Sequence, residues 1–223
     1  MKLLILIVLF SPIFILAQNN FAKNHKSPEY TEEFIKGKVD VSGHGFFDCL
    51  RRIGISEKEL LSCKGQKWLS VGEGKSDFIA QVSKRGIDGH ALDAVIKNPH
   101  APERSHLGLA QSLPFKDGEF DRVISVWLID YFFSSKVFND PDGGKKALQE
   151  MVRVAKVGGE IRINPVEQAQ LFTLLDAMKA DGKIRYETLP YYKGTFATKQ
   201  KQREFEITPI AETVGSVKIT KLK

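Results

Sequence analysis

The sequence is poor in cysteine. It contains only two cysteines in 223 residues, Cys49 and Cys63, and neither lies beside a histidine or within a Cys-x-x-Cys pair. Metal binding and thiol catalysis are therefore not expected. The two thiols could join in one disulfide or remain as two separate buried thiols, and their spacing along the chain does not decide between these states.

Long apolar runs are also rare, and only the first residues contain one. Apolar side chains fill most of positions 3–16, which follow a single charge at Lys2 and precede the small residue Ala17. This stretch is shorter than the about 20 residues that usually span a bilayer. Its layout is typical of a signal peptide over residues 1–17. We therefore expect an exported protein, either periplasmic or secreted, that has no membrane span once the signal is removed. The alternative is that the segment is not cleaved and anchors the protein in the membrane.

The excess of one sign of charge is small and spread along the chain. The 33 Lys and Arg residues against 27 Asp and Glu give a formal net charge of +6, and loss of Lys2 with the signal leaves 32 − 27 = +5. Only Lys193–Arg203 holds a modest cationic cluster. This distribution favours a solvated surface over an acidic partner, and it carries no specific nucleic-acid signal.

Length and patterning indicate one domain after a short helical prelude. A chain of 223 residues with 42% hydrophobic residues suits a single well-buried core. Residues 18–66 form a polar leader and the helical prelude, in which Ser56 and Glu59 have the spacing of a capping box. Residues 67–223 form the domain proper, because strands and helices begin to alternate there.

The alternating segments predict a Rossmann-like, doubly wound α/β fold. The first five expected strands lie at 68–71, 89–92, 106–110, 121–127 and 160–164. The expected helices lie at 76–84, 144–156 and 171–178. Three further strands are expected at 184–189, 204–210 and 216–222. The last two suit an antiparallel pair, which gives a mostly parallel sheet with an antiparallel C-terminal edge strand. In such sheets ligands bind where the parallel strands end.

A glycine turn between the first strand and its helix is the central candidate for a binding site. Gly72 and Gly74 flank Glu73, and glycines there let a ligand approach bare backbone at a helix N-terminus. A phosphate-binding loop would need glycine at Leu69, and a dinucleotide fingerprint would need it at Asp77. Nucleotide or phosphate binding through Lys75 therefore fits poorly.

Four stretches in order resemble a known family. They are Trp68–Ser76, Ala110-Gln-Ser-Leu-Pro-Phe115, Phe120-Asp-Arg-Val-Ile-Ser-Val-Trp127 and Ala147–Gly159. Their order and spacing are similar to those of class I S-adenosylmethionine-dependent methyltransferases, in particular the small-molecule type with the type 11 methyltransferase domain. The resemblance extends over roughly residues 67–164.

The resemblance implies S-adenosylmethionine as cofactor and a role for each strand end. The turn Gly72–Gly74 would face the methionine part, and Asp93 would accept hydrogen bonds from the ribose hydroxyls. Ala110 and Gln111 would lie beside the adenine, while Ser125 to Trp127 would border the methyl-transfer pocket. From the residues alone, Asp93 could equally be a solvated loop carboxylate or a helix cap.

Two family acids are missing. Ser70 stands where the first strand usually has an acid near the amino end of the cofactor, and Leu109 stands where one lies near the adenine amine; Glu73 could supply a replacement carboxylate. Two lost polar contacts of about 1 kcal/mol each would weaken cofactor binding about tenfold to a hundredfold. Two functions follow: an exported methyltransferase acting on a small-molecule acceptor, or an exported non-catalytic protein that keeps the fold as a binding module.

No general base stands out in the sequence. The candidates are His44, His90, His100, His106, Asp130 and Tyr131. None of the histidines has a partner at a recognised spacing, although His44, between two glycines ahead of the domain, could form part of a lid. Methyl transfer to a good nucleophile can proceed by positioning alone, so this gap does not argue against the reaction.

Overall fold

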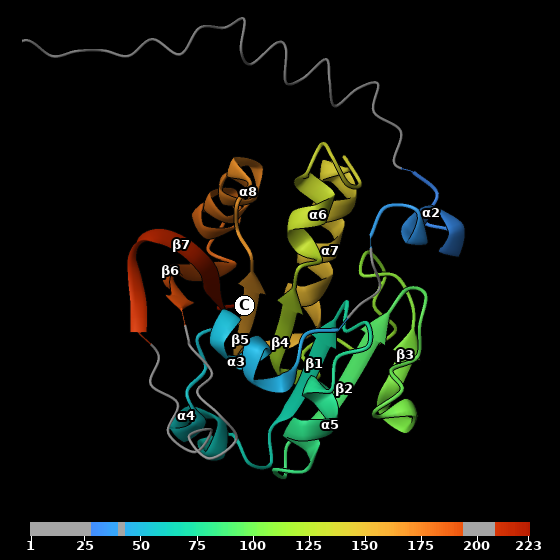
Figure 1. Ribbon diagram of the computed structural model, residues 1–223. Helices are drawn as coiled ribbons and strands as arrows, with labels where there is room; N and C mark the ends of the chain where they lie inside the picture. The colour runs from blue at the N-terminus through green and yellow to red at the C-terminus, as the bar shows by residue number, and fades with distance from the viewer. Residues whose placement is uncertain (1–27, 40–42, 194–207) are drawn as a thin grey trace, which may run out of the picture.

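A seven-stranded sheet forms the centre of the protein (Figure 1), whose computed structural model describes residues 28–39, 43–193 and 208–223. The strands are β1 (Lys67–Val71), β2 (Asp88–Asp93), β3 (Ser105–Leu107), β4 (Phe120–Val126), β5 (Ala155–Asn164), β6 (Ile184–Lys193) and β7 (Thr208–Lys221). They lie in the order β3-β2-β1-β4-β5-β7-β6, and β7 runs antiparallel to both neighbours. The predicted Rossmann-like, mostly parallel fold is confirmed.

The central strands are buried on both faces, which explains their continuous apolar sequence. In β1 the side chains of Trp68, Leu69 and Val71 are fully buried, and in β4 Val123 and Ile124 are nearly so. Parallel sheets covered by helices on both sides need apolar residues at consecutive positions. The same pattern made these strands recognisable from the sequence.

Two layers of helices cover the sheet. On one face lie α3 (Phe46–Arg52), α4 (Glu57–Ser62) and α5 (Phe78–Ser83), whose buried residues pack on Trp68 and Ile124. On the other lie α6 (Ile129–Phe133), α7 (Pro141–Val154) and α8 (Ala169–Ala180), which pack on Val123 and Ile161. In Figure 1, α3 and α5 stand in front of the sheet.

A short helix ahead of the domain is held by an aromatic cluster. Thr31 caps α2 (Glu32–Lys36), accepting a hydrogen bond from the Phe34 N–H at 3.1 Å. The Tyr30 hydroxyl donates to Asp140 at 2.7 Å, and the Tyr30 ring packs edge-on against Phe138. Burial and the Asp140 carboxylate raise the pKa of the Tyr30 hydroxyl. These contacts fix the pre-sheet chain beside α6 and α7.

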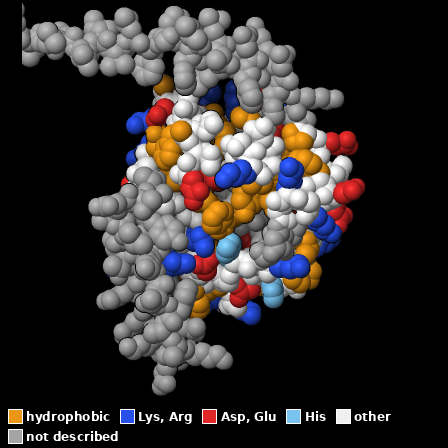
Figure 2. All heavy atoms as spheres, turned by 45° about the horizontal axis from the view of Figure 1, so that its top comes forward, with side chains coloured by type: hydrophobic (Ala, Val, Ile, Leu, Met, Phe, Trp, Pro, Cys, Tyr) orange, Lys and Arg blue, Asp and Glu red, His pale blue; other side chains and the backbone are white. Residues whose placement is uncertain are grey.

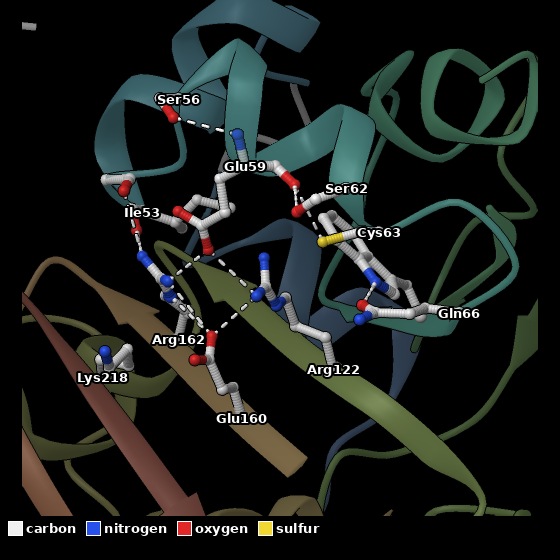
Figure 3. Close-up of polar contacts among 12 residues, drawn as sticks. Ile53, Ser56, Glu59, Ser62, Cys63, Gln66, Arg122, Glu160, Arg162 and Lys218 are labelled. Atoms are coloured by element: carbon white, nitrogen blue, oxygen red, sulfur yellow. Dashed lines mark hydrogen bonds and ion pairs between the residues drawn. The ribbon is translucent and has the colours of Figure 1, made fainter. Parts of the chain in front are cut away.

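Buried ionic contacts fix α3 and α4 to the sheet (Figure 3). Glu59 Oε1 lies 3.0 Å from Arg122 of β4 and 2.7 Å from Arg162 of β5, and Glu160 Oε2 lies 2.9 and 3.1 Å from the same two side chains. Arg162 also donates to the Ile53 carbonyl at 2.8 Å. The predicted capping box forms only in part, because Ser56 caps the Glu59 N–H at 3.1 Å while the Glu59 carboxylate pairs with the arginines.

Some segment predictions are wrong in detail. The expected pairing of 204–210 with 216–222 does not form: β7 spans Thr208–Lys221 as one strand between β5 and β6, and residues 204–207 lie outside the described chain. The helix expected to reach Lys156 ends at Val154, because β5 already begins at Ala155 and pairs with Phe120.

Both cysteines are buried free thiols. Cys49 lies in α3 and Cys63 directly follows α4, and neither takes part in a disulfide. This result selects the separate-thiol alternative. Burial raises the pKa of both thiols, so neither is a nucleophilic thiolate near neutral pH. The predicted signal peptide lies outside the described residues, and among those described no helix is long and apolar enough to cross a membrane.

Candidate functional site

A pocket opens where β1, β2 and β4 end, on the face turned forward in Figure 2. Hydrophobic side chains gather near the centre of this face, between charged ones. The pocket is lined by seven of the eight cofactor-binding residues predicted from the sequence: Ser70, Gly72, Glu73, Gly74, Asp93, Ala110 and Gln111. The structure therefore brings together residues from three separate segments of the chain.

Ser125 is the predicted site residue that does not line the pocket. Its neighbours Ile124 and Val126 do, and successive side chains of a strand point to opposite faces. Ser125 is fully buried, and its hydroxyl has no hydrogen-bond partner among the described residues. Strand alternation thus directs Ser125 away from the cavity.

The turn after β1 requires glycine. Gly72 has φ 76° and Gly74 has φ 57°, a region that residues with side chains rarely adopt. A Cβ on Gly72 would lie 2.9 Å from the Cβ of Leu128, so a side chain there would collide with the chain that follows β4. The turn leaves open backbone at the pocket, as the predicted approach of a ligand requires.

Asp93 holds this turn in place. One carboxylate oxygen accepts the Gly74 N–H at 3.0 Å, and the other accepts the Val95 N–H at 2.9 Å. The side chain is half-buried and lines the pocket. Asp93, the last residue of β2, therefore fixes the glycine turn, and its contact with ribose hydroxyls stays a prediction.

Glu73 turns toward the protein interior. Its carboxylate accepts the Ile79 N–H at 3.1 Å and the Asn98 side-chain amide at 3.3 Å, and only 6% of the residue is exposed. Burial raises the pKa of Glu73 to about 8, although hydrogen bonds from Ser70 and Ile79 oppose the shift. Near neutral pH, Glu73 is therefore largely protonated and does not provide a ready carboxylate in place of Ser70.

The wall predicted for the adenine follows β3. Ala110 is buried and Gln111 is half-buried, while Leu109 beside them is 37% exposed and also lines the pocket. The Gly108 N–H donates to the Asp93 carbonyl at 3.0 Å, which holds this wall beside the end of β2. Leu109 thus presents apolar surface at the position where the family has an acid.

The end of β4 forms an aromatic wall with an unsatisfied donor. Trp127 follows the strand with φ 68°, a strained value for a bulky residue, and its N–H donates to the Asn164 carbonyl at 2.5 Å. Its indole Nε1–H is buried and has no partner among the described residues. Buried donors are normally paired, so this one fits a ligand that offers an acceptor atom. Tyr131 and His44 lie beside the same indole, with ring centroids at 6.1 and 6.4 Å.

Sequence reasoning missed the contribution of the segment before the sheet. Tyr30, Ile35 and Val39 line the pocket alongside His44, although they precede β1 by many residues. Their only sequence signal is apolar character in the segment predicted as a helical prelude. Contacts between such distant positions, for example the one from Tyr30 to Asp140, leave no local pattern.

The other candidate bases lie elsewhere. His90 and His106 contact each other at 3.3 Å on β2 and β3, outside the pocket lining, and His100 is exposed. Asp130 is buried and accepts the Glu167 N–H at 2.9 Å, a structural role. No group of histidine, cysteine or acidic side chains suited to a metal ion occurs in the part of the chain that the structure describes.

The chain is similar to methyltransferases in sequence pattern and in fold. A profile of the family described as "Methyltransferase domain" matches residues 69–163, whereas no curated protein is significantly similar in sequence. Among solved structures, a TehB-like SAM-dependent methyltransferase from Corynebacterium glutamicum is 14% identical, with 95% of this chain and 97% of that chain covered and a TM-score of 0.49. A SAM-dependent methyltransferase from Thermotoga maritima, described as a possible histamine N-methyltransferase, is 15% identical, with 86% and 98% covered and a TM-score of 0.46. The profile match shows a methyltransferase domain over residues 69–163, which is less than half of the chain.

Proposed function

We propose that this protein is a methyltransferase that uses S-adenosylmethionine to methylate a small-molecule acceptor. The observation that carries the proposal is one continuous pocket that joins the glycine turn, Asp93 and Trp127. The cofactor supplies a methyl group activated by a positively charged sulfur. The residues present fit the cofactor, because the glycine turn Gly72–Gly74, the Asp93 carboxylate and the unpaired Trp127 indole N–H lie at neighbouring strand ends.

Each part of the pocket has a separate task in this proposal. The turn Gly72–Gly74 admits the methionine part against bare backbone, and Asp93 accepts hydrogen bonds from the ribose while it keeps the turn in shape. Ala110 and Gln111 hold the adenine. The aromatic wall around Trp127 binds the acceptor and excludes water, which strengthens polar contacts inside.

A second function is favoured by one specific feature, the replacement of two family acids on the cofactor side. Ser70 and Leu109 replace two family acids, and burial keeps Glu73 largely protonated near neutral pH. A protein with this pocket could retain the fold as a non-catalytic binding module. Weak or absent cofactor affinity is what this alternative requires.

Restoring the acids distinguishes the two functions. We would titrate S-adenosylhomocysteine into the full-length chain and into the double variant Ser70→Asp/Leu109→Asp by calorimetry. Micromolar binding by the wild type, gaining about tenfold or less in the variant, supports a working enzyme. Binding that appears only in the double variant supports the binding module and contradicts the methyltransferase.

We also propose that residues 1–17 direct export of the protein. The proposal rests on the single basic residue, the short apolar stretch and the small residue at Ala17. Mass spectrometry of the protein recovered outside the cytoplasm should find a chain that begins near Gln18. Recovery of the intact chain, Met1 included, only inside the cell would contradict it.

A further inference from the structure

The segment Gly43–Phe46, here called the strap, packs across the proposed cofactor turn Gly72–Gly74 and the residues that follow it. The His44 carbonyl accepts a hydrogen bond from the Ser76 hydroxyl at 2.5 Å, and the Phe46 N–H donates to Asp77 at 2.7 Å. A Cβ on Gly43 would lie 2.1 Å from the Ser76 nitrogen, so this strap touches the turn directly. The position of the His44 ring is therefore set by the same residues that shape the cofactor side of the pocket.

A carboxylate orients the His44 ring. His44 Nδ1 lies 3.0 Å from Asp48 Oδ2, one helical turn along α3. Burial alone would raise the pKa of Asp48, but hydrogen bonds from His44, Arg52 and Arg51 outweigh it and hold that pKa below its usual range. An ionised carboxylate only accepts hydrogen bonds, so Nδ1 carries the proton of the neutral ring and Nε2 keeps a lone pair.

The ring of His44 lies at the acceptor end of the pocket. It stacks on Trp127 with an interplanar angle of 23° and a centroid distance of 6.4 Å, and its side chain is 35% exposed. The unpaired indole Nε1–H belongs to the same Trp127. The lone pair on His44 Nε2 can accept a hydrogen bond from a ligand, and the unpaired Trp127 Nε1–H can donate one.

The surrounding charges favour an acceptor that becomes negative. Arg52 lies over the Trp127 ring at 5.4 Å and donates to Asp48 at 2.7 Å, and Arg51 contacts Asp48 as well. Beside the His44 ring, the two guanidinium groups therefore outnumber the single carboxylate of Asp48. From the other packed elements, Tyr131 of α6 faces Trp127, while Glu73 and Asp93 line the cofactor side. This balance disfavours a cationic amine and stabilises an oxyanion.

The remaining lining at this end is apolar. Leu128, Phe132 and Phe138 line the pocket together with Ile35 and Val39 of the pre-sheet segment. Such a lining favours the burial of an uncharged apolar or aromatic molecule. Together with the charges, it indicates an aromatic alcohol rather than an amine or a carboxylate.

We propose that His44 is the general base of the reaction, and that the acceptor is a small apolar molecule with a weakly acidic hydroxyl group of the phenol type. The inference rests on the proposed methyltransferase function. His44 Nε2 takes the hydroxyl proton, Asp48 stabilises the resulting imidazolium, and the Trp127 indole N–H holds the acceptor oxygen.

The proton and electron pairs balance without a further reactant. The acceptor O–H bond breaks, and its proton passes to His44 Nε2. The electron pair left on oxygen forms the new bond to the methyl carbon, while the pair of the old carbon–sulfur bond stays on sulfur. The imidazolium then releases its proton to water, which restores the base.

The first test reads the imidazole itself, independently of turnover. In nitrogen-15 NMR spectra of the full-length chain, His44 should show a protonated Nδ1 and a bare Nε2. Addition of 2-naphthol to the protein saturated with S-adenosylhomocysteine should shift the His44 Nε2 resonance and leave exposed His100 unchanged. A protonated His44 Nε2 would overturn the inference. A His44 Nε2 chemical shift that does not change when 2-naphthol is added would also overturn it.

The second test follows methyl transfer from S-adenosylmethionine to 2-naphthol. His44→Gln should lower the rate about 10²- to 10⁴-fold and change the pH profile of the reaction. The control variant His100→Gln should keep the wild-type rate and pH profile. Trp127→Phe should weaken 2-naphthol binding about three- to tenfold with little change in kcat.

The outcomes separate this inference from the proposed function. If the wild type does not bind S-adenosylhomocysteine, the methyltransferase proposal fails. If it binds that compound but neither binds nor methylates 2-naphthol, the assigned acceptor class is wrong. If His44→Gln retains the wild-type rate and pH profile, His44 is not the base, whatever the acceptor.

Discussion

At the scale of single residues, Glu73 gives the clearest dependence on pH. Burial raises its pKa to about 8 from the ordinary 4.5. The folded state therefore keeps a proton that the unfolded chain releases above about pH 4.5. Glu73 then lowers the free energy of unfolding progressively as the pH rises from about 4.5 to about 8, and its contribution levels off above that range.

Glu73→Gln should remove this dependence, because glutamine resembles the protonated acid and its oxygen can still accept the Ile79 N–H. We expect the variant to match the wild type near pH 4 and to exceed its unfolding free energy by about 4–5 kcal/mol near pH 9. Urea unfolding at both pH values measures the difference. Exposed Glu33→Gln is the control, and an equal gain at both pH values would show that titration of Glu73 is not its source.

At the scale of elements, the strap Gly43–Phe46 depends on a close approach of two backbones. Gly43→Ala would place a Cβ 2.1 Å from the Ser76 nitrogen and 2.2 Å from the Lys75 carbonyl carbon, neither of which can yield like a side chain. We expect the strap to detach from the turn and S-adenosylhomocysteine affinity to fall about tenfold or more.

The neighbouring glycine provides a matched control for this change. A Cβ on Gly45 meets no atom within 4 Å, and its φ of −66° suits alanine. Gly45→Ala should therefore keep wild-type affinity in the same titration. Equal affinities for both variants would contradict a role for the strap in shaping the cofactor side of the pocket.

The contact of α4 with the sheet depends on Glu59. Glu59→Gln removes one negative charge from a cluster in which the side chains of Arg122 and Arg162 are only 7% and 5% exposed. Glu160 still contacts both arginines in this variant and the Glu59 side chain is 31% exposed, so we expect a loss of unfolding free energy of about 1–2 kcal/mol. Thermal or urea unfolding measures it, and the exposed Glu57→Gln should change stability by less than about 1 kcal/mol.

The strands and the glycine turn could be predicted because their causes are local. Trp68–Val71 is apolar throughout because both faces are covered, and Gly72 and Gly74 adopt positive φ values that other residues rarely take. The order of the stretches along the chain then placed Asp93 and Gln111 at the same rim. Ser125 was misplaced because a one-residue step along a strand reverses the direction of a side chain.

At the scale of the whole molecule, the unpredicted part of the site comes from long-range packing. His44 reaches Trp127 only because the strap crosses the turn after β1, and Tyr30 reaches the pocket through Asp140 of another layer. The pairing of β7 with both β5 and β6 likewise depends on the finished sheet. Such contacts depend on the assembled fold, and no short stretch of sequence encodes them.

The central claim is that this pocket binds S-adenosylmethionine, and calorimetric titration of the cofactor and of S-adenosylhomocysteine into the full-length chain tests it most directly. We predict one site per chain with micromolar affinity, lost in Gly72→Ala because its Cβ would collide with Leu128. The absence of binding at millimolar cofactor, or equal binding by Gly72→Ala, would contradict the account.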